Sequence, residues 1–195
     1  MDYMGEETAD SLETHIAIAE RFSFKARFVL VFGDVNHATA RATCERLIAL
    51  AHESEEPITM LISSPGGHVE SGDAIHDLIR FVRAPVTTVG TGWVASAGTH
   101  IFLAPPKNRR VCLPNTRFMI HQLGGGAGGQ ATDVAIQAKE ILRTHERIAR
   151  EISTQTGQPL EKVKADMERD FWMSADQAIE YGIVSRIIEK HEDLL

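Results

Sequence analysis

The chain has 195 residues, of which 43% are hydrophobic and 24% charged. This length fits one domain with a packed core, and the composition excludes a disordered, collagen-like or coiled-coil protein. The formal net charge of -7 argues against a broad phosphate-binding surface, so we expect no nucleic-acid partner. The two cysteines, Cys44 and Cys112, lack the spacing of a zinc ribbon, and we expect neither a disulfide nor a metal site.

The start of the chain is acidic and polar rather than basic and then apolar, which is not typical of a secretion signal. The longest continuous apolar run, Phe28–Phe32, is far shorter than a membrane span. We therefore expect a cytoplasmic protein with no membrane partner. Residues 1–20 are expected to form a flexible acidic segment, followed by a single domain at residues 21–190.

Strands and helices are predicted to alternate along this domain. Three apolar stretches are predicted to form strands: Phe28–Phe32, Ile58–Ile62 and Val86–Val89. The first is a continuous apolar run, as expected of a strand buried on both faces. Each is followed by apolar residues at helical spacing, in the stretches 36–51, 75–82 and from about Ser96 onward. The repetition predicts βαβ units, and therefore an α/β fold with a mostly parallel sheet.

The second half of the domain continues this pattern with one unusually long helix. Residues 117–121 are predicted to form a short strand, and the glycine-rich segment 124–129 follows it. The next apolar stripe predicts a helix over about residues 132–154, which at 1.5 Å per residue is roughly 30 Å long. Such a helix is expected to protrude or to contact a partner. A last helix begins at a capping box formed by Ser174 and Gln177.

Groups with useful chemistry lie where the predicted strands end, and in open α/β sheets ligands bind at those ends. The segment Ser64-Pro65-Gly66-Gly67 turns with bare backbone N–H groups, which can hold an oxyanion. Ser96 stands where a strand passes into a helix, and the unpartnered amides of a first helical turn favour negative charge there. Taken alone, Ser96 is more simply explained as a helix-start or packing residue.

His121, at the end of a predicted strand, is a candidate general base. Its imidazole, with an intrinsic pKa near 6.5, can take a proton from a serine and return it to a leaving amine. An orienting carboxylate is also needed, and position alone cannot select one among 27 acidic residues. Asp170, which precedes an apolar stretch, is the acid we expect to be partly buried. Taken alone, His121 fits a half-buried structural histidine and Asp170 an ion-pair partner of Arg169.

Other residues that attract attention have simpler explanations. His68 and His76 have no recognised spacing for metal ligands, so they are expected to be solvated. The glycine-rich segment 124–129 lacks the Lys-Ser or Lys-Thr of a phosphate-binding loop, which argues against a nucleotide site. Trp93 and Trp172 are expected to pack rather than to bind.

From about Phe28 onward the chain resembles the ClpP family of self-compartmentalising serine peptidases. Seven segments agree with that family in order and spacing: 64–67, 95–98, 113–115, 119–122, 129–133, 168–170 and 180–182. The resemblance implies a divergent member with the ClpP/crotonase-like fold, in which the helix 132–154 is the handle between two rings.

The resemblance also assigns roles to single residues. It implies a catalytic triad with Ser96 as the nucleophile, His121 as general base and acid, and Asp170 as the orienting acid. It places the oxyanion hole at the backbone amides of Gly67 and Ala97.

A peptide-binding groove is implied along the glycine-rich segment, including Gly124, Gly125 and Gly126. No cofactor is implied, because ATP is used by the partner unfoldase and not by this chain.

The implied function is a serine endopeptidase that hydrolyses unfolded polypeptides inside a ring chamber. The implied assembly is a homo-oligomer of heptameric rings stacked as a tetradecamer, with an AAA+ unfoldase such as ClpX or ClpA. Two departures affect partner docking: the residues before Arg21 differ from the family's usual N-terminal segment, and Leu61 replaces a common tyrosine.

These departures leave an alternative open, a structural or conditionally active ring subunit that needs a paralogous partner ring. A third hypothesis is thioester chemistry of the related crotonase fold, which uses two backbone amides without a serine or a histidine. The presence of all three triad residues argues against it.

Overall fold

The computed structural model describes residues 9–122, 124 and 128–194 of the chain. In the first half of this range, strands alternate with helices in the order α1 (Ala9–Lys25), β1 (Phe28–Val35), α2 (His37–Glu53), β2 (Ile58–Gly67), α3 (Val69–Phe81), β3 (Val86–Ala95) and α4 (Ala97–Phe102). The second half contains a 3-10 turn (Lys107–Arg109), β4 (Arg110–Cys112), β5 (Arg117–Ile120), α5 (Ala131–Thr156), α6 (Leu160–Asp166), β6 (Phe171–Ser174), α7 (Ala175–Tyr181), β7 (Arg186–Ile187) and a last 3-10 turn (His191–Leu194).

The strands form one sheet that branches at β3. The order of the main path is β1-β2-β3-β4-β7, and all of its pairings are parallel. The first part of β3 pairs with β4, whereas its last part, residues 93–95, pairs with β5. Strand β6 then adds to β5 in the antiparallel direction. This arrangement confirms the predicted α/β fold with a mostly parallel sheet.

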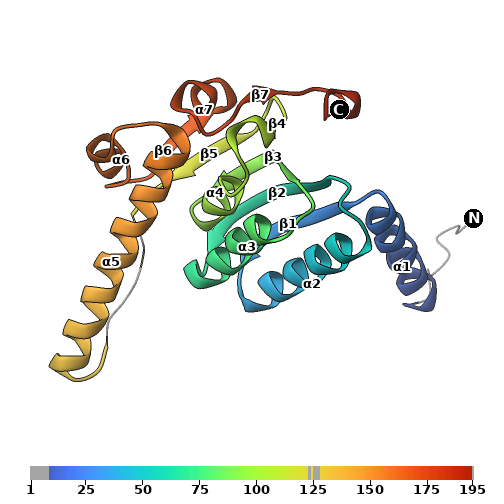
Figure 1. Cartoon of the computed structure of the whole chain (residues 1–195). Helices are drawn as coiled ribbons and strands as arrows, with labels where there is room; N and C mark the ends of the chain where they lie inside the picture. Colours follow the sequence, from blue (N-terminus) through green and yellow to red (C-terminus); the bar gives the residue numbers. More distant parts are fainter. Residues whose placement is uncertain (1–8, 123, 125–127, 195) are drawn as a thin grey trace, which may run out of the picture.

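Helices α2, α3 and α4 cover one face of the central strands (Figure 1). The core lies between these two layers, where apolar side chains of both layers are fully buried: Val31, Leu47, Met60, Ile62, Ile75 and Phe102. Each such side chain contributes roughly 1.5–3 kcal/mol through removal of its apolar surface from water. This packing fixes the strand ends to which the candidate site residues belong.

Two strands are longer than the sequence predicts. β2 continues from Ile62 to Gly67 although a proline and two glycines follow its apolar run, and β3 continues from Val89 to Ala95 although two glycines follow its apolar run. The β1–β2 and β2–β3 pairings shift register in these segments, so the irregular residues are accommodated as bulges and the strands go on. Because of these extensions, both strands reach the candidate site.

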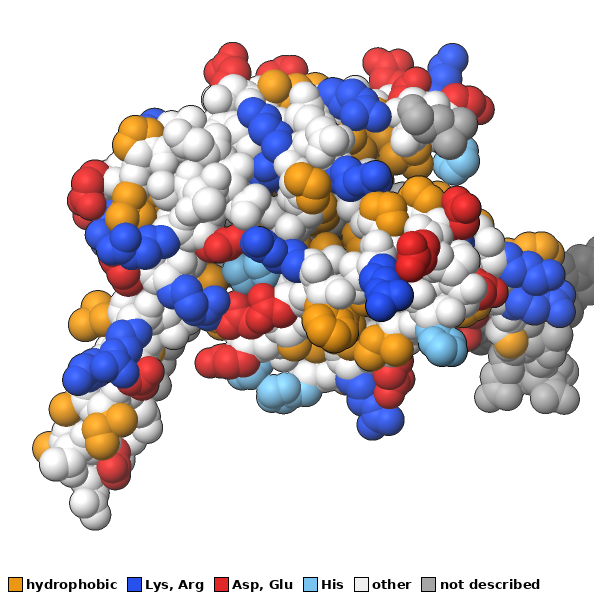
Figure 2. Space-filling view, in the orientation of Figure 1, with side chains coloured by type: hydrophobic (Ala, Val, Ile, Leu, Met, Phe, Trp, Pro, Cys, Tyr) orange, Lys and Arg blue, Asp and Glu red, His pale blue; other side chains and the backbone are white. Residues whose placement is uncertain are grey.

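The long helix α5 includes the whole range 132–154 predicted for it. Its first part projects away from the rest of the molecule (Figure 1), and its buried residues, Ile148, Ala149 and Ile152, belong to its last turns. We call these last turns, residues 147–155, the base of α5. The projecting part carries hydrophobic as well as charged side chains on its surface (Figure 2).

The N-terminal segment contains a helix, and the flexibility expected for residues 1–20 stays a prediction. Helix α1 begins at Ala9 and continues across residue 20 to Lys25, so the described part of this segment is helical. The first eight residues lie outside the described residues, and the domain boundary at residue 20 stays a prediction. Among the helices that are described, none combines the length and the apolar character needed to cross a membrane.

Candidate active site

Ser96 occupies the sharp turn between β3 and α4. Its φ of 55° and ψ of -122° lie in a region that non-glycine residues rarely adopt, and such backbone strain persists only where the surroundings hold it. The amide of Ser96 donates to the carbonyl of Met119 at 3.0 Å, and the buried hydroxyl of Thr99 lies 2.8 Å from that same carbonyl. The turn is therefore held against β5, and it presents the Ser96 hydroxyl at the end of the sheet.

The glycine segment at the end of β2 packs directly against this turn. A Cβ added to Gly66, whose φ is +96°, would lie 2.6 Å from Cβ of Ser96 and 2.8 Å from the carbonyl oxygen of Ala95. A Cβ on Gly67 would overlap the carbonyl of Val35. Glycine is thus required at both positions, because a side chain at Gly66 would displace the Ser96 turn and one at Gly67 would displace the end of β1.

Strand pairing brings His121 next to Ser96 on one side and next to Asp170 on the other. β5 lies parallel to β3, with Met119 opposite Ala95, so Ser96 and His121 both follow the ends of neighbouring strands. β6 lies antiparallel to β5, with Ile120 opposite Phe171, and the next pair in this register is His121 and Asp170. Residues distant in the sequence are in this way placed side by side.

The three side chains form a continuous polar chain. Nε2 of His121 lies 2.9 Å from Oγ of Ser96, and Nδ1 of His121 lies 3.0 Å from Oδ1 of Asp170. A carboxylate only accepts hydrogen bonds, so Nδ1 carries the proton donated to Asp170. The lone pair of Nε2 then faces the Ser96 hydroxyl, which donates to it. An imidazole held in this tautomer can accept a proton from the serine.

The expectation that Asp170 is partly buried is wrong for this chain. Its side chain is 62% exposed, compared with 30% for His121. Asp170 lies just before the first residue of β6, a strand that pairs with β5 only among the described strands. The carboxylate forms its ion pair with His121, and not with the neighbouring Arg169.

A small, mainly apolar pocket lies beside the serine. Its volume is about 30 Å³, enough for roughly two water molecules. It is lined by Val69, Ser96, Ala97, His100, Ile120, His121, Ile148 and Ile152. The two isoleucines come from the base of α5. Sequence reasoning placed them in the apolar stripe of the long helix, but the stripe gave no sign that it borders the site.

Part of the expected peptide groove lies outside the residues that the structure describes. Gly124 belongs to the described residues, whereas Gly125 and Gly126 do not. The groove assignment of the three glycines therefore stays a prediction.

The histidines expected to be solvated differ from one another. The His68 side chain is 43% exposed, but His76 is buried, so the expectation is wrong for His76. The cause is the ring of His100, which stacks on His76 from α4. Within residues 9–122, 124 and 128–194, no group of three or more potential ligand side chains is arranged to hold a metal ion.

Comparison with known proteins gives consistent matches over nearly the whole chain. A family model described as Clp protease matches residues 11–191. ATP-dependent Clp protease proteolytic subunit 3 of Rhizobium johnstonii is 51% identical over 171 residues, covering 88% of this chain and 88% of that protein. ATP-dependent Clp protease proteolytic subunit 2 of Gluconobacter oxydans is 51% identical over 191 residues, covering 97% of this chain and 86% of that protein.

Solved structures agree with these sequence matches. ClpP1 from Listeria monocytogenes has 46% sequence identity and a TM-score of 0.82, covering 91% of this chain and 99% of that chain. A point mutant of the same protein has a TM-score of 0.85 with the same identity and coverage. The fold expected from the resemblance is thereby confirmed.

Proposed function

Because this chain belongs to the Clp protease family, whose proteolytic subunits are serine peptidases, we propose that it hydrolyses peptide bonds with Ser96 as the nucleophile. His121 is the general base and acid, and Asp170 orients its ring. The single observation that carries this proposal is the chain of contacts at 2.9 and 3.0 Å from the Ser96 hydroxyl through His121 to Asp170.

The geometry supports a two-step acyl transfer. Oγ of Ser96 attacks the peptide carbonyl carbon while its proton passes to Nε2 of His121, and Asp170 stabilises the imidazolium that forms. When the tetrahedral intermediate collapses, Nε2 returns the proton to the leaving amine and an acyl-serine remains. Water then attacks the ester, again giving its proton to Nε2, and the carboxylic product leaves as Oγ of Ser96 recovers a proton.

The amides of Gly67 and Ala97 are the proposed oxyanion donors for these steps. Support comes from the close packing of the Gly66 segment on the Ser96 turn, which brings the end of β2 and the start of α4 together. Preorganised donors of this kind stabilise the developing negative charge, and loss of one costs about 3–4 kcal/mol of transition-state stabilisation.

The pocket beside Ser96 is the proposed site for the side chain that precedes the cleaved bond. Its apolar lining favours an apolar side chain, and its volume of about 30 Å³ favours a short one. An unfolded polypeptide can present such a side chain on an extended backbone anywhere along its length. The proposed substrates are therefore unfolded polypeptides.

Ring assembly is proposed from the same family relationship. Ile136 and Leu142 are largely exposed on the projecting part of α5, as expected if this helix meets a second ring. The proposed assembly consists of two stacked heptameric rings that enclose the sites. The relatives' names describe them as ATP-dependent, which supports an AAA+ unfoldase, such as ClpX or ClpA, as the partner of this chain.

A second candidate is a conditionally active subunit that needs a paralogous ring. The exposure of Asp170 favours it, since a neighbouring subunit that covered this carboxylate would strengthen its contact with His121. Reaction of the isolated protein with a fluorophosphonate probe separates the two candidates. Rapid labelling of Ser96 without a partner contradicts the conditional form.

The main test is hydrolysis of a fluorogenic peptide, measured on a size-exclusion fraction whose mass is determined at the same time. Ser96→Ala is expected to lower kcat by at least about 10⁴-fold. Ser23→Ala, which removes an exposed hydroxyl on α1, serves as the matched control and is expected to keep the wild-type rate. Equal rates for Ser96→Ala and the wild type would contradict the proposal.

A further inference from the structure

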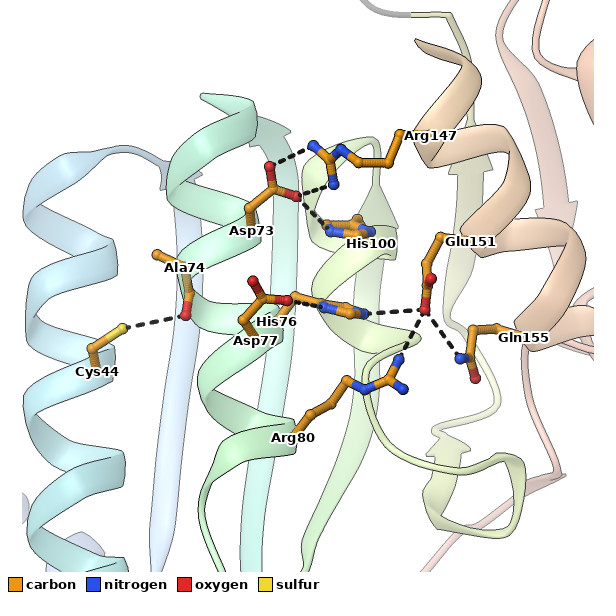
Figure 3. A network of polar contacts seen from close by, with 10 residues as sticks. All are labelled: Cys44, Asp73, Ala74, His76, Asp77, Arg80, His100, Arg147, Glu151 and Gln155. Atoms are coloured by element: carbon orange, nitrogen blue, oxygen red, sulfur yellow. Dashed lines mark hydrogen bonds and ion pairs between the residues drawn. The ribbon is translucent and has the colours of Figure 1, made fainter. Parts of the chain in front are cut away.

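Two buried histidines stack between α3 and the base of α5 (Figure 3). His76 belongs to α3 and His100 to α4, and their ring centroids lie 4.3 Å apart with planes inclined by 8°. Both side chains are only 5% exposed. His100 also lines the pocket beside Ser96, so the stack connects that pocket to the surrounding helices.

His100 is tied to α5 through a shared carboxylate. Its Nε2 lies 2.9 Å from Oδ1 of Asp73, and Arg147 of α5 donates to both oxygens of the same carboxylate at 3.0 and 2.6 Å. Burial alone would raise the pKa of Asp73, but these hydrogen bonds outweigh it and hold the pKa well below its ordinary value. Asp73 is therefore ionised near neutral pH, and Nε2 of His100 donates to it.

His76 faces a second acidic group on α5. Its Nδ1 lies 3.1 Å from Asp77, and its Nε2 lies 3.6 Å from Oε1 of Glu151. Arg80 and Gln155 donate to the same Glu151 oxygen at 3.0 and 3.1 Å (Figure 3). Nε2 of His76 is buried, and no hydrogen-bond partner for it occurs in the described part of the chain.

The same turns of α5 hold the pair and form the pocket. Arg147 and Glu151, which contact the network, immediately precede Ile148 and Ile152, which line the pocket. A shift of this part of the helix relative to α3 therefore changes both sets of contacts together.

We propose that the His76–His100 pair is a positioning element that sets the shape of the pocket beside Ser96 through the base of α5, and that a proton taken up by His76 strengthens this contact. The inference rests on the proposed function, because it assigns the pocket to the residue before the cleaved bond.

The proton has a definite place in this arrangement. With Nδ1 donating to Asp77, neutral His76 directs the lone pair of Nε2 toward the carboxylate of Glu151. Protonation replaces this lone pair with an N–H group, which can donate to Glu151 and pull α5 closer to α3. Two stacked imidazolium rings would repel each other, which disfavours a charge on both rings at once.

The surroundings determine where this step occurs on the pH scale. The charged or titratable groups that face the pair are Asp73, Asp77 and Arg80 of α3, and Arg147 and Glu151 of α5. Burial, followed by the neighbouring His100, lowers the pKa of His76 below its ordinary value of 6.5, although Asp77 and Glu151 act in the opposite direction. His76 is thus neutral at pH 7, and it takes up the proton only below its ordinary pKa of 6.5.

The test compares two fluorogenic peptides that differ only before the cleaved bond. One carries 2-aminobutyrate, whose ethyl group fits the small pocket, and the other carries glycine, which leaves it empty. Because ionisation of His121 affects both substrates equally, the ratio of their kcat/KM values reports on the pocket alone. We expect Arg147→Gln to lower this ratio at least about fivefold. Arg143→Gln, the same change one turn earlier on α5, should leave it unchanged.

The proton step is tested by measuring the same ratio between about pH 8 and pH 5. In the wild type, the preference for 2-aminobutyrate should rise as the pH falls. His76→Phe keeps an aromatic ring on His100 but cannot bind the proton, so its ratio should stay flat. An identical pH profile in wild type and His76→Phe would overturn the proposal, and so would equal ratios for the two arginine variants.

Hydrogen exchange separates this inference from the proposed function. Arg147→Gln should speed amide exchange in segments 97–100 and 148–152, whereas Arg143→Gln should not. If the wild type cleaves neither peptide, the peptidase proposal fails, and this exchange comparison still decides the role of the pair. Equal protection of both segments in the two variants would overturn the positioning role of the His76–His100 pair. The Arg147 side chain is 51% exposed, so this comparison does not depend on folding of the His76 variant.

Discussion

Gly66→Ala tests the close packing on which the candidate site depends. The added Cβ would lie 2.6 Å from Cβ of Ser96, 2.8 Å from the oxygen of Ala95 and 2.9 Å from the amide nitrogen of Ala97. Two of these three neighbours are backbone atoms, which cannot rotate away. The turn that carries the serine must therefore move.

The cost of this substitution has two parts. The positive φ of +96° at Gly66 costs a non-glycine residue roughly 1 kcal/mol, and overpacking against a fixed neighbour adds about 1–3 kcal/mol. We expect the free energy of unfolding to fall by about 2–4 kcal/mol. A displacement of the serine by about 1 Å is enough to lower kcat roughly 100-fold.

Gly157→Ala is the matched control for this prediction. Gly157 has a φ of +78°, but a Cβ there would meet no atom of the described chain within 4 Å. Only the backbone part of the cost applies, so this variant should lose about 1 kcal/mol of stability and keep full activity. Urea unfolding and peptide hydrolysis measure the two effects. Wild-type kcat in Gly66→Ala would refute the argument from close packing.

Three further predictions follow from single contacts. Asp170→Asn should lower kcat by about 10³–10⁴-fold in steady-state assays, yet change the free energy of unfolding by less than about 1 kcal/mol, because the ion pair is exposed. Thr99→Val should cost about 1–3 kcal/mol in urea unfolding and lower kcat, since its buried hydroxyl lies 2.8 Å from two backbone carbonyls that hold the serine turn. The pKa of Asp73 in the folded protein lies below its ordinary value of 3.8. The ionised carboxylate therefore stabilises the folded protein above pH 3.8, and this stabilisation is lost as the pH falls through the folded-state pKa. Unfolding measured against pH should show a flatter acid limb in Asp73→Asn than in the wild type.

The alternation of apolar strands and amphipathic helices was readable from local periodicity, and so was the position of Ser96 at a strand-to-helix turn. His121 followed from the same reasoning, because parallel strands end at one edge of the sheet. Asp170 could not be found in this way. Its place opposite His121 depends on the antiparallel pairing of β6 with β5, a contact between distant segments that leaves no local pattern.

Burial of His76 shows the same limit. His76 follows the apolar Ile75 along α3, at the boundary between the buried and the solvated face of the helix. The sequence alone does not show on which side of this boundary the histidine lies. The stacked ring of His100 and the carboxylate of Glu151 decide its environment, and both come from other helices. Likewise, the glycines after the apolar runs of β2 and β3 predict an end to each strand, but the pairing continues because the neighbouring strands shift register there.

The most direct test of the account is the rate at which a fluorophosphonate labels the protein, with the modified residue located by mass spectrometry. If His121 activates Ser96 across their 2.9 Å contact, a single adduct forms on Ser96, its rate increases as the imidazole loses its proton, and His121→Ala abolishes it. Labelling of Ser96 at an unchanged rate in His121→Ala, or a dominant adduct on another residue, would contradict the account.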